Sequence, residues 1–316
     1  MIRYAELCRH PTAFPSLTGL RRAEFDELAA RFAPAEAQRR AGSATTRRDR
    51  RPRQNAPGAG RPYAHSAHDR LLMALLWLRV YPTYEVLGFF FGLHKRNAQL
   101  NVLAALEVLD GLGDFPFDRP GRDRKKLRSA REVMTAYPQV RLVVDGKEQR
   151  VNRPTGYDAQ RPYYSGKKKA HTIKTQVAVD PCGRIEALTA SVPGGANHDL
   201  TLLRTSGVLE RLGEGEAVML DKGYVGVKNY YPSVAVVLPF RASRGQPLTE
   251  EQKGHNREVA RYRIVVEHTL AQLNRFTALR QVYRAKRRER HSQLIRVVAK
   301  LVNRRLAVQP LKTYAA

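Results

Sequence analysis

The chain has 316 residues, of which 42% are hydrophobic, so it can form one large domain or two modest ones around a real core. Lysine and arginine total 56 against 29 acids, and the resulting net charge of +27 indicates a polyanionic partner, with DNA or RNA the natural candidate. An acidic membrane is the rival, but no apolar run approaches the roughly 18 residues of a membrane span and no signal peptide opens the chain.

The first part of the chain alternates helical segments with a basic one. Small helices are expected over residues 1–37. Residues 38–62 are rich in arginine, glycine and proline and nearly lack large apolar side chains, which predicts a basic flexible linker. This segment is either an arm that orders on DNA or a plain disordered linker. Residues 63–132 then form a module that resembles a helix-turn-helix.

The pattern within that module is typical of a DNA-reading helix pair. A leucine-rich helix is expected over 67–80, and Thr83 can cap a second helix that stops near Gly92. A third helix starts with basic and amide side chains, which would face phosphates or base edges: Lys95, Arg96, Asn97 and Gln99. The alternative is an ordinary three-helix bundle whose polar end is solvated.

From about residue 133 to 316 the pattern predicts a mixed α/β domain. Five strands are expected, with an antiparallel hairpin beside parallel strands: 139–145, 171–180, 184–192, 217–221 and 233–240. Helices are expected over 199–212, about 250–276 and about 288–307, with an insertion loop at about 240–255.

Two of these strands end in an aspartate at the carboxyl edge of the sheet, where functional groups of open α/β sheets gather. Asp145 closes LVVD and Asp221 closes VMLD. Glu267 follows on a helix, at the margin of an apolar stripe that includes Val266 and Leu270, from which it could reach the strand ends. The alternatives are that Asp145 belongs to an Asp-Gly turn and that Glu267 forms an ordinary helix pair with Arg263.

Three carboxylates of this kind suit the breakage of a phosphodiester. Two metal ions about 3.5–4 Å apart can activate a water or a 3′-hydroxyl and stabilise the leaving oxygen. Hard oxygen ligands select Mg²⁺ or Mn²⁺ over zinc. The chain's two cysteines, Cys8 and Cys182, lie far apart, which argues against a disulfide framework or a cysteine-rich zinc site and suits a reducing cytosol.

Several segments together resemble bacterial insertion-sequence transposases of the DDE class, in the branch related to eukaryotic Harbinger elements. They occur in the family's order over about 139–307 and comprise VVDGKEQRV, YYSGKKKAHTIKTQVAVD, GGANHDLTLL, MLDKGYVG and RYRIVVEHTLAQLNRF. The front half, with FPSLTGLRRAEFDELA, also looks like the family's amino-terminal module. Any one of these motifs is weak, but the ordered set is fairly specific.

The resemblance implies an RNase H-like catalytic core over 133–316 and dependence on Mg²⁺ (or Mn²⁺), with two ions per active site. It assigns Asp145, Asp221 and Glu267 to the catalytic and metal-binding triad. It also implies recognition of the element's terminal inverted repeats and of target DNA. Because two element ends must be held together, we expect a homodimer on DNA in the cytoplasm, associated with the nucleoid.

The chain departs from the pattern of related groups around the glutamate. A tyrosine seven residues before Glu267 and a lysine seven residues after it are replaced by Ala260 and Asn274, although Tyr262 and Arg275 lie nearby and could substitute. The arginine of that pattern, Arg263, is present. These differences concern DNA contacts and not the triad.

Other side chains have two interpretations each. Lys167, Lys168 and Lys169 either grip DNA phosphate or solvate a β-edge, and the charge of the chain favours DNA. Lys222 is well placed for a substrate phosphate, and Tyr224 either stacks on an unpaired base or packs in the core. His198 and Asp199 could bind metal, but the favoured interpretation is a helix start at which Asn197 is the cap and Asp199 favours the positive end.

The sequence therefore predicts a DNA transposase that performs hydrolysis and strand transfer at one metal site. Two alternatives remain: a DNA-binding protein descended from a transposase that has lost catalysis, and a metal-dependent DNA endonuclease without strand transfer.

Overall fold

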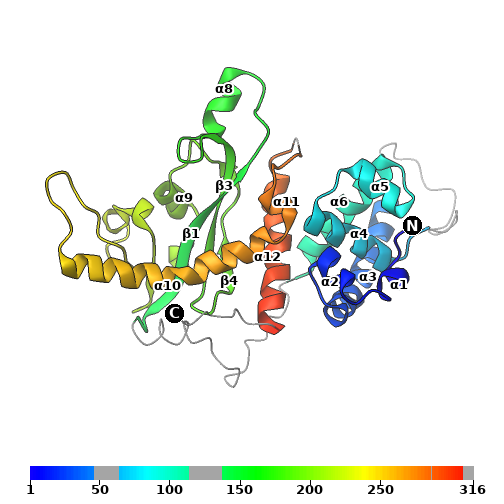
Figure 1. Cartoon of the computed structure of the whole chain (residues 1–316), viewed down its shortest axis with the longest axis horizontal. Coiled ribbons are helices and arrows are strands. Elements are labelled where there is room, and N and C mark those ends of the chain that lie inside the picture. The colour runs from blue at the N-terminus through cyan, green and yellow to red at the C-terminus, as the bar shows by residue number, and fades with distance from the viewer. Residues whose placement is uncertain (46–63, 114–136, 286, 309–316) are drawn as a thin grey trace. The chain divides into compact units, whose positions relative to one another are not determined.

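A computed structural model of the chain describes residues 1–45, 64–113, 137–285 and 287–308, and Figure 1 shows its elements. The chain divides into two compact units. Unit 1 comprises Met1–Phe115 with Arg275–Ala278, and unit 2 comprises Pro116–Asn274 with Leu279–Ala316. Most of the predicted linker of 38–62, and the last part of the module predicted over 63–132, lie outside the described residues.

Unit 1 contains the helices of the amino-terminal half. Its helices are α1 (Tyr4–Leu7), α2 (Ala13–Thr18), α3 (Arg22–Thr45), α4 (Ala67–Val80), α5 (Tyr84–Phe91) and α6 (Lys95–Gly111). Helix α3 continues to Thr45, so residues 38–45 are helical although the sequence predicted a flexible linker there. The low content of large apolar side chains in this stretch hid the helix, because alanine and arginine are good helix formers even without an apolar stripe.

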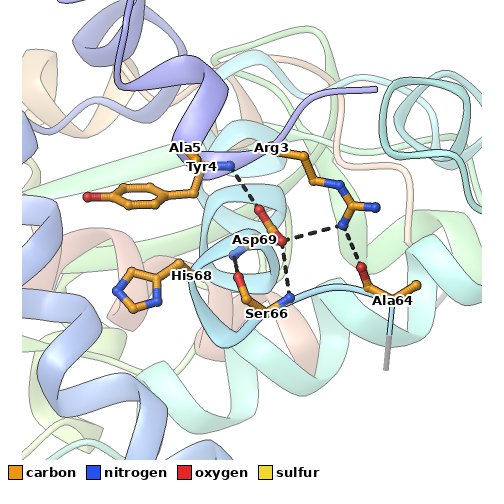
Figure 2. Close-up of a pocket in the computed structure, with 7 residues that line it drawn as sticks. All are labelled: Arg3, Tyr4, Ala5, Ala64, Ser66, His68 and Asp69. Atoms are coloured by element: carbon orange, nitrogen blue, oxygen red, sulfur yellow. Dashed lines mark hydrogen bonds and ion pairs between the residues drawn. The ribbon is translucent and has the colours of Figure 1, made fainter. Parts of the chain in front are cut away.

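Helix α4 is the apolar centre of unit 1. Its leucines are fully buried, and Trp77 is buried with them, as expected of a core residue. The helix starts with a capping box in which Ser66 and Asp69 exchange hydrogen bonds. The Asp69 carboxylate also accepts from the backbone N–H of Tyr4 and pairs with Arg3 at 3.4 Å, so it ties the start of the chain to α4 (Figure 2).

Helices α5 and α6 join through a tight turn that glycine permits. Thr83 caps α5 as predicted, because its side chain accepts from the Val86 N–H at 3.3 Å. Gly92 ends α5 with φ of 64°, a left-handed conformation that favours glycine. A Cβ on Gly88 would lie 2.4 Å from the Leu93 carbonyl oxygen, so the turn approaches the helix closely. This geometry is compatible with both the helix-turn-helix and the three-helix bundle.

Unit 2 is built on one mixed sheet with the strand order β2-β3-β1-β6-β7, and β4 and β5 also pair with β3. The strands are β1 (Val140–Arg150), β2 (Tyr164–Ser165), β3 (Ala170–Val179), β4 (Ile185–Leu188), β5 (Val192–Pro193), β6 (Ala217–Met219) and β7 (Ala235–Val237). Strand β1 is antiparallel to β3 and parallel to β6, and β6 is parallel to β7. The mixed α/β class and the five expected strands are confirmed, and two short strands are added.

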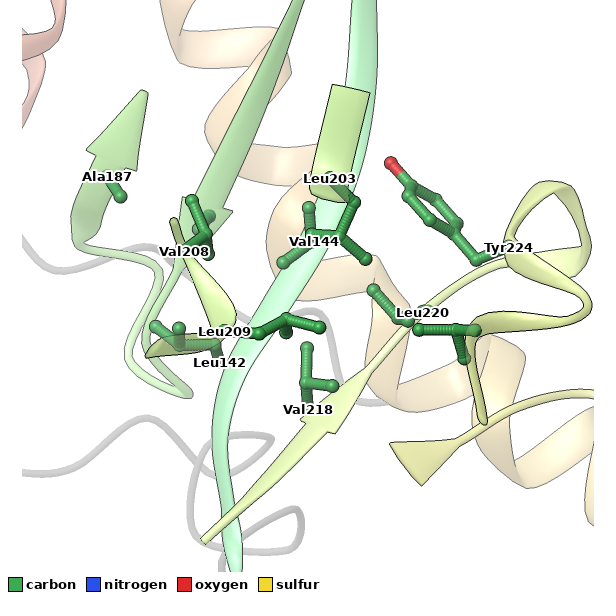
Figure 3. Close-up of a cluster of buried hydrophobic side chains, with 11 residues drawn as sticks. Leu142, Val144, Ala187, Leu203, Val208, Leu209, Val218, Leu220 and Tyr224 are labelled. Atoms are coloured by element: carbon green, nitrogen blue, oxygen red, sulfur yellow. The ribbon is translucent and has the colours of Figure 1, made fainter. Parts of the chain in front are cut away.

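One face of the sheet carries the core of unit 2. Leu142 and Val144 of β1 pack there with Val218, Leu220 and other buried side chains, among them Leu203 of helix 199–205 (Figure 3). Alternate residues of β1 face the opposite side, where Lys147 bonds Asn274 and Gln149 bonds His291 of the last helices of the chain. The sheet is therefore covered by helices on both faces.

Of the three helices expected in unit 2, α10 (Glu250–Asn274) and α12 (Arg290–Val308) are confirmed, whereas α9 (Asp199–Thr205) is shorter than predicted. Helix α9 stops early and a short 3₁₀ turn follows at Leu209–Arg211. Helix α10 begins at Glu250, inside the expected insertion loop of 240–255. The other α-helices among the described residues of this unit are α8 (Tyr157–Gln160) and α11 (Thr277–Arg280), the latter shared with unit 1. No helix in the described part of the chain is both long and apolar enough to cross a bilayer.

Candidate active site

The parallel pairing of β1 and β6 brings Asp145 and Asp221 to the same level of the sheet. Val143 pairs with Met219, and each aspartate follows its paired residue by two positions. Two residues further along parallel strands, side chains return to the same face at the same height. The expected meeting of the two carboxylates at one edge is thus built into the strand register.

The environment of Asp145 differs from the prediction in one respect. Strand β1 does not end at this residue, and it continues to Arg150 because β3 still pairs with it, with Asp145 opposite Val177. The alternative in which Asp145 belongs to an Asp-Gly turn is therefore also wrong. Asp145 marks the level at which the parallel neighbour β6 ends, so one side of β1 is left open there.

The carboxylate of Asp145 is largely buried and is held by two donors. Its Oδ1 accepts from the Gly146 N–H at 2.8 Å, and its Oδ2 lies 3.5 Å from the Arg263 guanidinium of α10. Burial raises the pKa of Asp145, and the neighbouring charge of Asp221 raises it further, whereas Arg263 and Lys167 act in the opposite direction. The two carboxylates together form a negatively charged site that a bound cation would stabilise.

Asp221 starts a 3₁₀ turn directly after β6. Its Oδ1 accepts from the Gly223 N–H at 2.7 Å, which fixes the carboxylate at the start of Lys222–Tyr224. The preceding residue, Leu220, is fully buried, and its N–H donates to the Val237 carbonyl. A rigid strand end therefore positions this half-exposed carboxylate.

Glu267 lies on α10, four residues after Arg263, with its side chain exposed. Arg263 contacts Asp145, and Asn274 accepts from Lys147 at 2.6 Å, so two side chains of this helix meet β1 on either side of Glu267 in the sequence. Among the described residues, however, no three His, Cys, Asp or Glu side chains gather closely enough to hold a metal ion. The structure thus brings Asp145, Asp221 and Arg263 together without bringing in Glu267.

Asp199 is a neighbour of both aspartates that the sequence did not favour as a site residue. A Cβ on Gly146 would lie 3.0 Å from one of its carboxylate oxygens, and a Cβ on Gly223 would lie 3.1 Å from the other. The predicted cap is wrong: His198 is the N-cap of α9 and makes no side-chain capping bond, while the Asn197 amide donates to the Pro193 carbonyl. No signal in the sequence marks Asp199 as a neighbour of Gly146 and Gly223, because the contact arises from the fold.

Tyr224 is fully buried in the core, which supports the packing interpretation over base stacking. Its hydroxyl accepts from the Gln176 side-chain amide at 2.9 Å. Burial raises the pKa of this tyrosine well above its ordinary value, and the charges of Asp199, Asp145 and Asp221 add to the effect. The charges of three carboxylates therefore favour the neutral hydroxyl.

Four of the predicted basic residues of unit 2 are exposed, whereas Arg263 is mostly buried against Asp145. Lys167, Lys168 and Lys169 form the tight turn between β2 and β3, and Lys169 has a positive φ of 49°, so it belongs to the turn and not to the strand. The charge of Lys167 acts on Asp145 and lowers its pKa. Lys222, next to Asp221, is also exposed.

The remaining predicted DNA-binding residues belong to unit 1. Lys95, Arg96 and Gln99 lie in the first turns of α6, where Arg96 donates to the Gln99 side chain at 3.1 Å and Lys95 pairs with Glu85 at 3.7 Å. The side chain of Arg275 is exposed, and its carbonyl accepts from Arg79.

The two aspartates fit a hard divalent cation. Carboxylate oxygens are the ligands that Mg²⁺ and Mn²⁺ prefer, and a cation would offset the burial and mutual repulsion that raise the pKa of Asp145. Phosphate oxygens and water commonly complete such shells.

The sequence of the chain is similar to known proteins. The chain matches a family model described as DDE superfamily endonuclease over residues 144–303, which includes both aspartates and Glu267. It is also 31% identical over 242 residues to a probable transposase for insertion sequence element IS702 from Microchaete diplosiphon, covering 76% of this chain and 81% of that protein. No solved structure was found to match the chain.

Proposed function

The chain belongs to the DDE superfamily of endonucleases and is related to an insertion-sequence transposase, and from this premise we propose that it is itself the transposase of an insertion sequence. In this proposal it binds the element's terminal inverted repeats, cuts DNA there and joins the freed ends to target DNA. The observation that carries the proposal is the position of Asp145 and Asp221, each two residues beyond the last pair of the parallel strands β1 and β6, inside the matched region.

We assign the catalytic triad to Asp145, Asp221 and Glu267, on an RNase H-like core of the Harbinger-related branch. Glu267 follows Arg263 by one helical turn, and Arg263 already contacts Asp145. A modest rotation of the Glu267 side chain or a shift of α10 when DNA and metal bind would add the third carboxylate. In free enzymes, catalytic contacts are often longer than in the working complex.

Each side chain then has a separate task in the reaction. Two bound Mg²⁺ or Mn²⁺ ions would activate the attacking oxygen and stabilise the leaving oxygen. The carboxylates of Asp145 and Asp221 hold these ions at the sheet edge, and Arg263 fixes the orientation of Asp145. Exposed Lys167 and Lys222 bind the phosphates that flank the scissile bond.

DNA recognition is assigned to the basic surfaces outside this centre. Lys168 and Lys169 bind backbone phosphate beside the active site, and Lys95, Arg96 and Gln99 at the start of α6 read the terminal repeat. Arg275 adds a phosphate contact. Two copies of the chain hold two element ends, so the active form on DNA is a homodimer, acting at the nucleoid.

The decisive experiment is cleavage of a labelled duplex that ends in the terminal repeat of the encoding element. We expect cutting at the repeat end with Mg²⁺ or Mn²⁺, none with EDTA, and a loss of more than about 100-fold in Asp221→Ala, because even residues outside the first ligand shell are worth 10–100-fold. Asp158→Asn, an exposed acid in the first turn of α8, is the control and should cut normally.

Two other outcomes would select the alternatives. Repeat-specific binding without cutting in any metal would make the chain a DNA-binding protein with inherited acids. Cutting without joining, when a pre-cut element end is offered with target DNA, would make it an endonuclease that lacks strand transfer.

A further inference from the structure

Asp199 lies between the two glycines that follow the proposed metal-binding aspartates. Its two oxygens are 3.0 Å and 3.1 Å from the positions where a Cβ would stand on Gly146 and on Gly223. The second of these positions is also 2.9 Å from Asp221 Oδ1, so the carboxylates of Asp199 and Asp221 are near neighbours. A larger residue at either glycine would have to displace Asp199, so these glycines leave room for its carboxylate.

The carboxylate is held from its other side by a buried ion network. Lys174 of β3 lies 3.2 Å from Asp199 Oδ1 and 3.8 Å from Glu148 Oε1 of β1, and it donates to the Asn197 carbonyl at 3.0 Å. The side chains of Lys174 and Glu148 are only 10% and 8% exposed. Ion pairs shielded from water keep their geometry better than surface pairs, because leaving one charge alone is costly.

The backbone of Asp199 is fixed as well. Its carbonyl accepts from the Gln176 side-chain amide, which also donates to the Tyr224 hydroxyl. Gln176 lies opposite Gly146 in the β1–β3 pairing, and Tyr224 follows Gly223. A single set of contacts therefore runs from the segment of Asp145, through α9, to the segment of Asp221.

We propose that Asp199 is a positioning residue for the metal site: it sets the spacing of Asp145 and Asp221 by packing against the backbone at Gly146 and Gly223. It does not itself bind the metal, since its carboxylate is engaged by Lys174. This inference rests on the proposed function, in which Asp145 and Asp221 bind the same metal ions. Residues that orient metal ligands without touching the ion tune metal affinity by about 10–100-fold.

The test measures Mn²⁺ binding to the protein without DNA, by the electron paramagnetic resonance signal of free Mn²⁺. The variants are Asp199→Ala, which empties the space between the glycines, and Asp199→Asn, which keeps its shape. We expect Asp199→Ala to weaken Mn²⁺ binding at least about tenfold and Asp199→Asn to weaken it less. Thermal unfolding is followed in parallel, and Asp158→Asn should match the unmodified chain in both measurements.

A second measurement separates positioning from a general role in stability. In metal-dependent nicking of supercoiled plasmid DNA, Asp199→Ala should need more Mn²⁺ for half-maximal rate, while the rate at saturating Mn²⁺ is largely recovered. If Asp199→Ala does not fold, Gly146→Ala probes the same contact from the opposite side and should shift the Mn²⁺ requirement in the same direction.

The outcomes distinguish this inference from the function on which it rests. Unchanged Mn²⁺ binding and requirement in Asp199→Ala, beside a clear loss of binding in Asp221→Ala, would overturn the positioning role alone. A reduced maximal rate with an unchanged Mn²⁺ requirement would also overturn it. Absence of Mn²⁺ binding and nicking in the unmodified chain would instead overturn the proposed metal-dependent function.

Discussion

Asp145 shows how a single residue can serve function at the expense of stability. Its carboxylate is buried beside Asp221, and burial raises its pKa although Arg263 lies 3.5 Å away. Between the ordinary pKa and the raised one, the folded chain binds more protons than the unfolded chain. Stability therefore falls as the pH rises through that interval, and the deficit persists at neutral pH.

We expect Asp145→Asn to abolish DNA cleavage and to raise the melting temperature at neutral pH. The amide has a similar shape, its oxygen can keep the bond from the Gly146 N–H, and it removes the buried charge. The stability gain should disappear as the pH is lowered below the ordinary carboxyl pKa, where both chains are neutral at this position. Melting curves at a series of pH values, without metal, check this.

Metal provides the control for that prediction. Mn²⁺ that binds only the folded chain should raise the melting temperature of the unmodified protein and not that of Asp145→Asn. Equal melting temperatures of the two chains at every pH would show that the buried charge is fully compensated and would contradict the argument.

At the scale of elements, a chain of hydrogen bonds fastens α12 to the sheet. His291 of α12 bonds Gln149 of β1 at 2.8 Å through Nε2 and Ser191 at 2.7 Å through Nδ1. The Gln149 amide nitrogen donates to the Gln281 carbonyl, so its oxygen is the acceptor and His291 Nε2 carries the proton. In the neutral ring, Nδ1 then accepts from the Ser191 hydroxyl.

Acid should therefore loosen this contact. Burial lowers the pKa of His291 to about 3, with Lys147 and Arg288 acting in the same direction. Below the unfolded pKa of about 6.5 the unfolded chain binds the extra proton first, so stability is lost as the pH falls, by about 1.4 kcal/mol per unit. Between pH 7 and pH 5, the free energy of unfolding should fall by roughly 2 kcal/mol less in His291→Gln than in the unmodified chain.

Urea unfolding at the two pH values measures this difference, whatever the absolute stability of the variant. The exposed His10 offers the control, and His10→Gln should keep the pH dependence of the unmodified chain. Identical pH dependence in His291→Gln would mean that the ring takes up its proton as readily in the folded chain as in the unfolded chain.

The sequence predicted the presence of helices and strands better than their end points or the contacts between residues far apart in the chain. Strand alternation and helix periodicity located β1, β3, β6 and α10, because these patterns record which face is buried. The continuation of β1 past Asp145 was not visible, since it depends on pairing with β3. The nearness of Asp199 was equally hidden: nothing local in GGANHDL shows that its carboxylate meets the backbone at Gly146 and Gly223.

At the scale of the whole molecule, the net charge of +27 is the property with the widest consequence. Such a chain repels itself in isolation, and binding to DNA releases counterions condensed on the phosphates. The logarithm of the affinity should then fall linearly with the logarithm of the salt concentration, with a slope of about 0.9 per phosphate contacted.

The lysine turn between β2 and β3 allows one part of that slope to be tested. Lys168 and Lys169 are exposed there, whereas Lys167 is left unchanged because its charge acts on Asp145. In Lys168→Ala/Lys169→Ala, the salt slope of binding to a non-specific duplex in EDTA should be shallower by about 2. Lys253→Ala, which removes a lysine already paired with Glu250 at 2.8 Å, should leave the slope unchanged. An equal slope in all three proteins would instead make this turn a solvated β-edge, the alternative that the sequence left open.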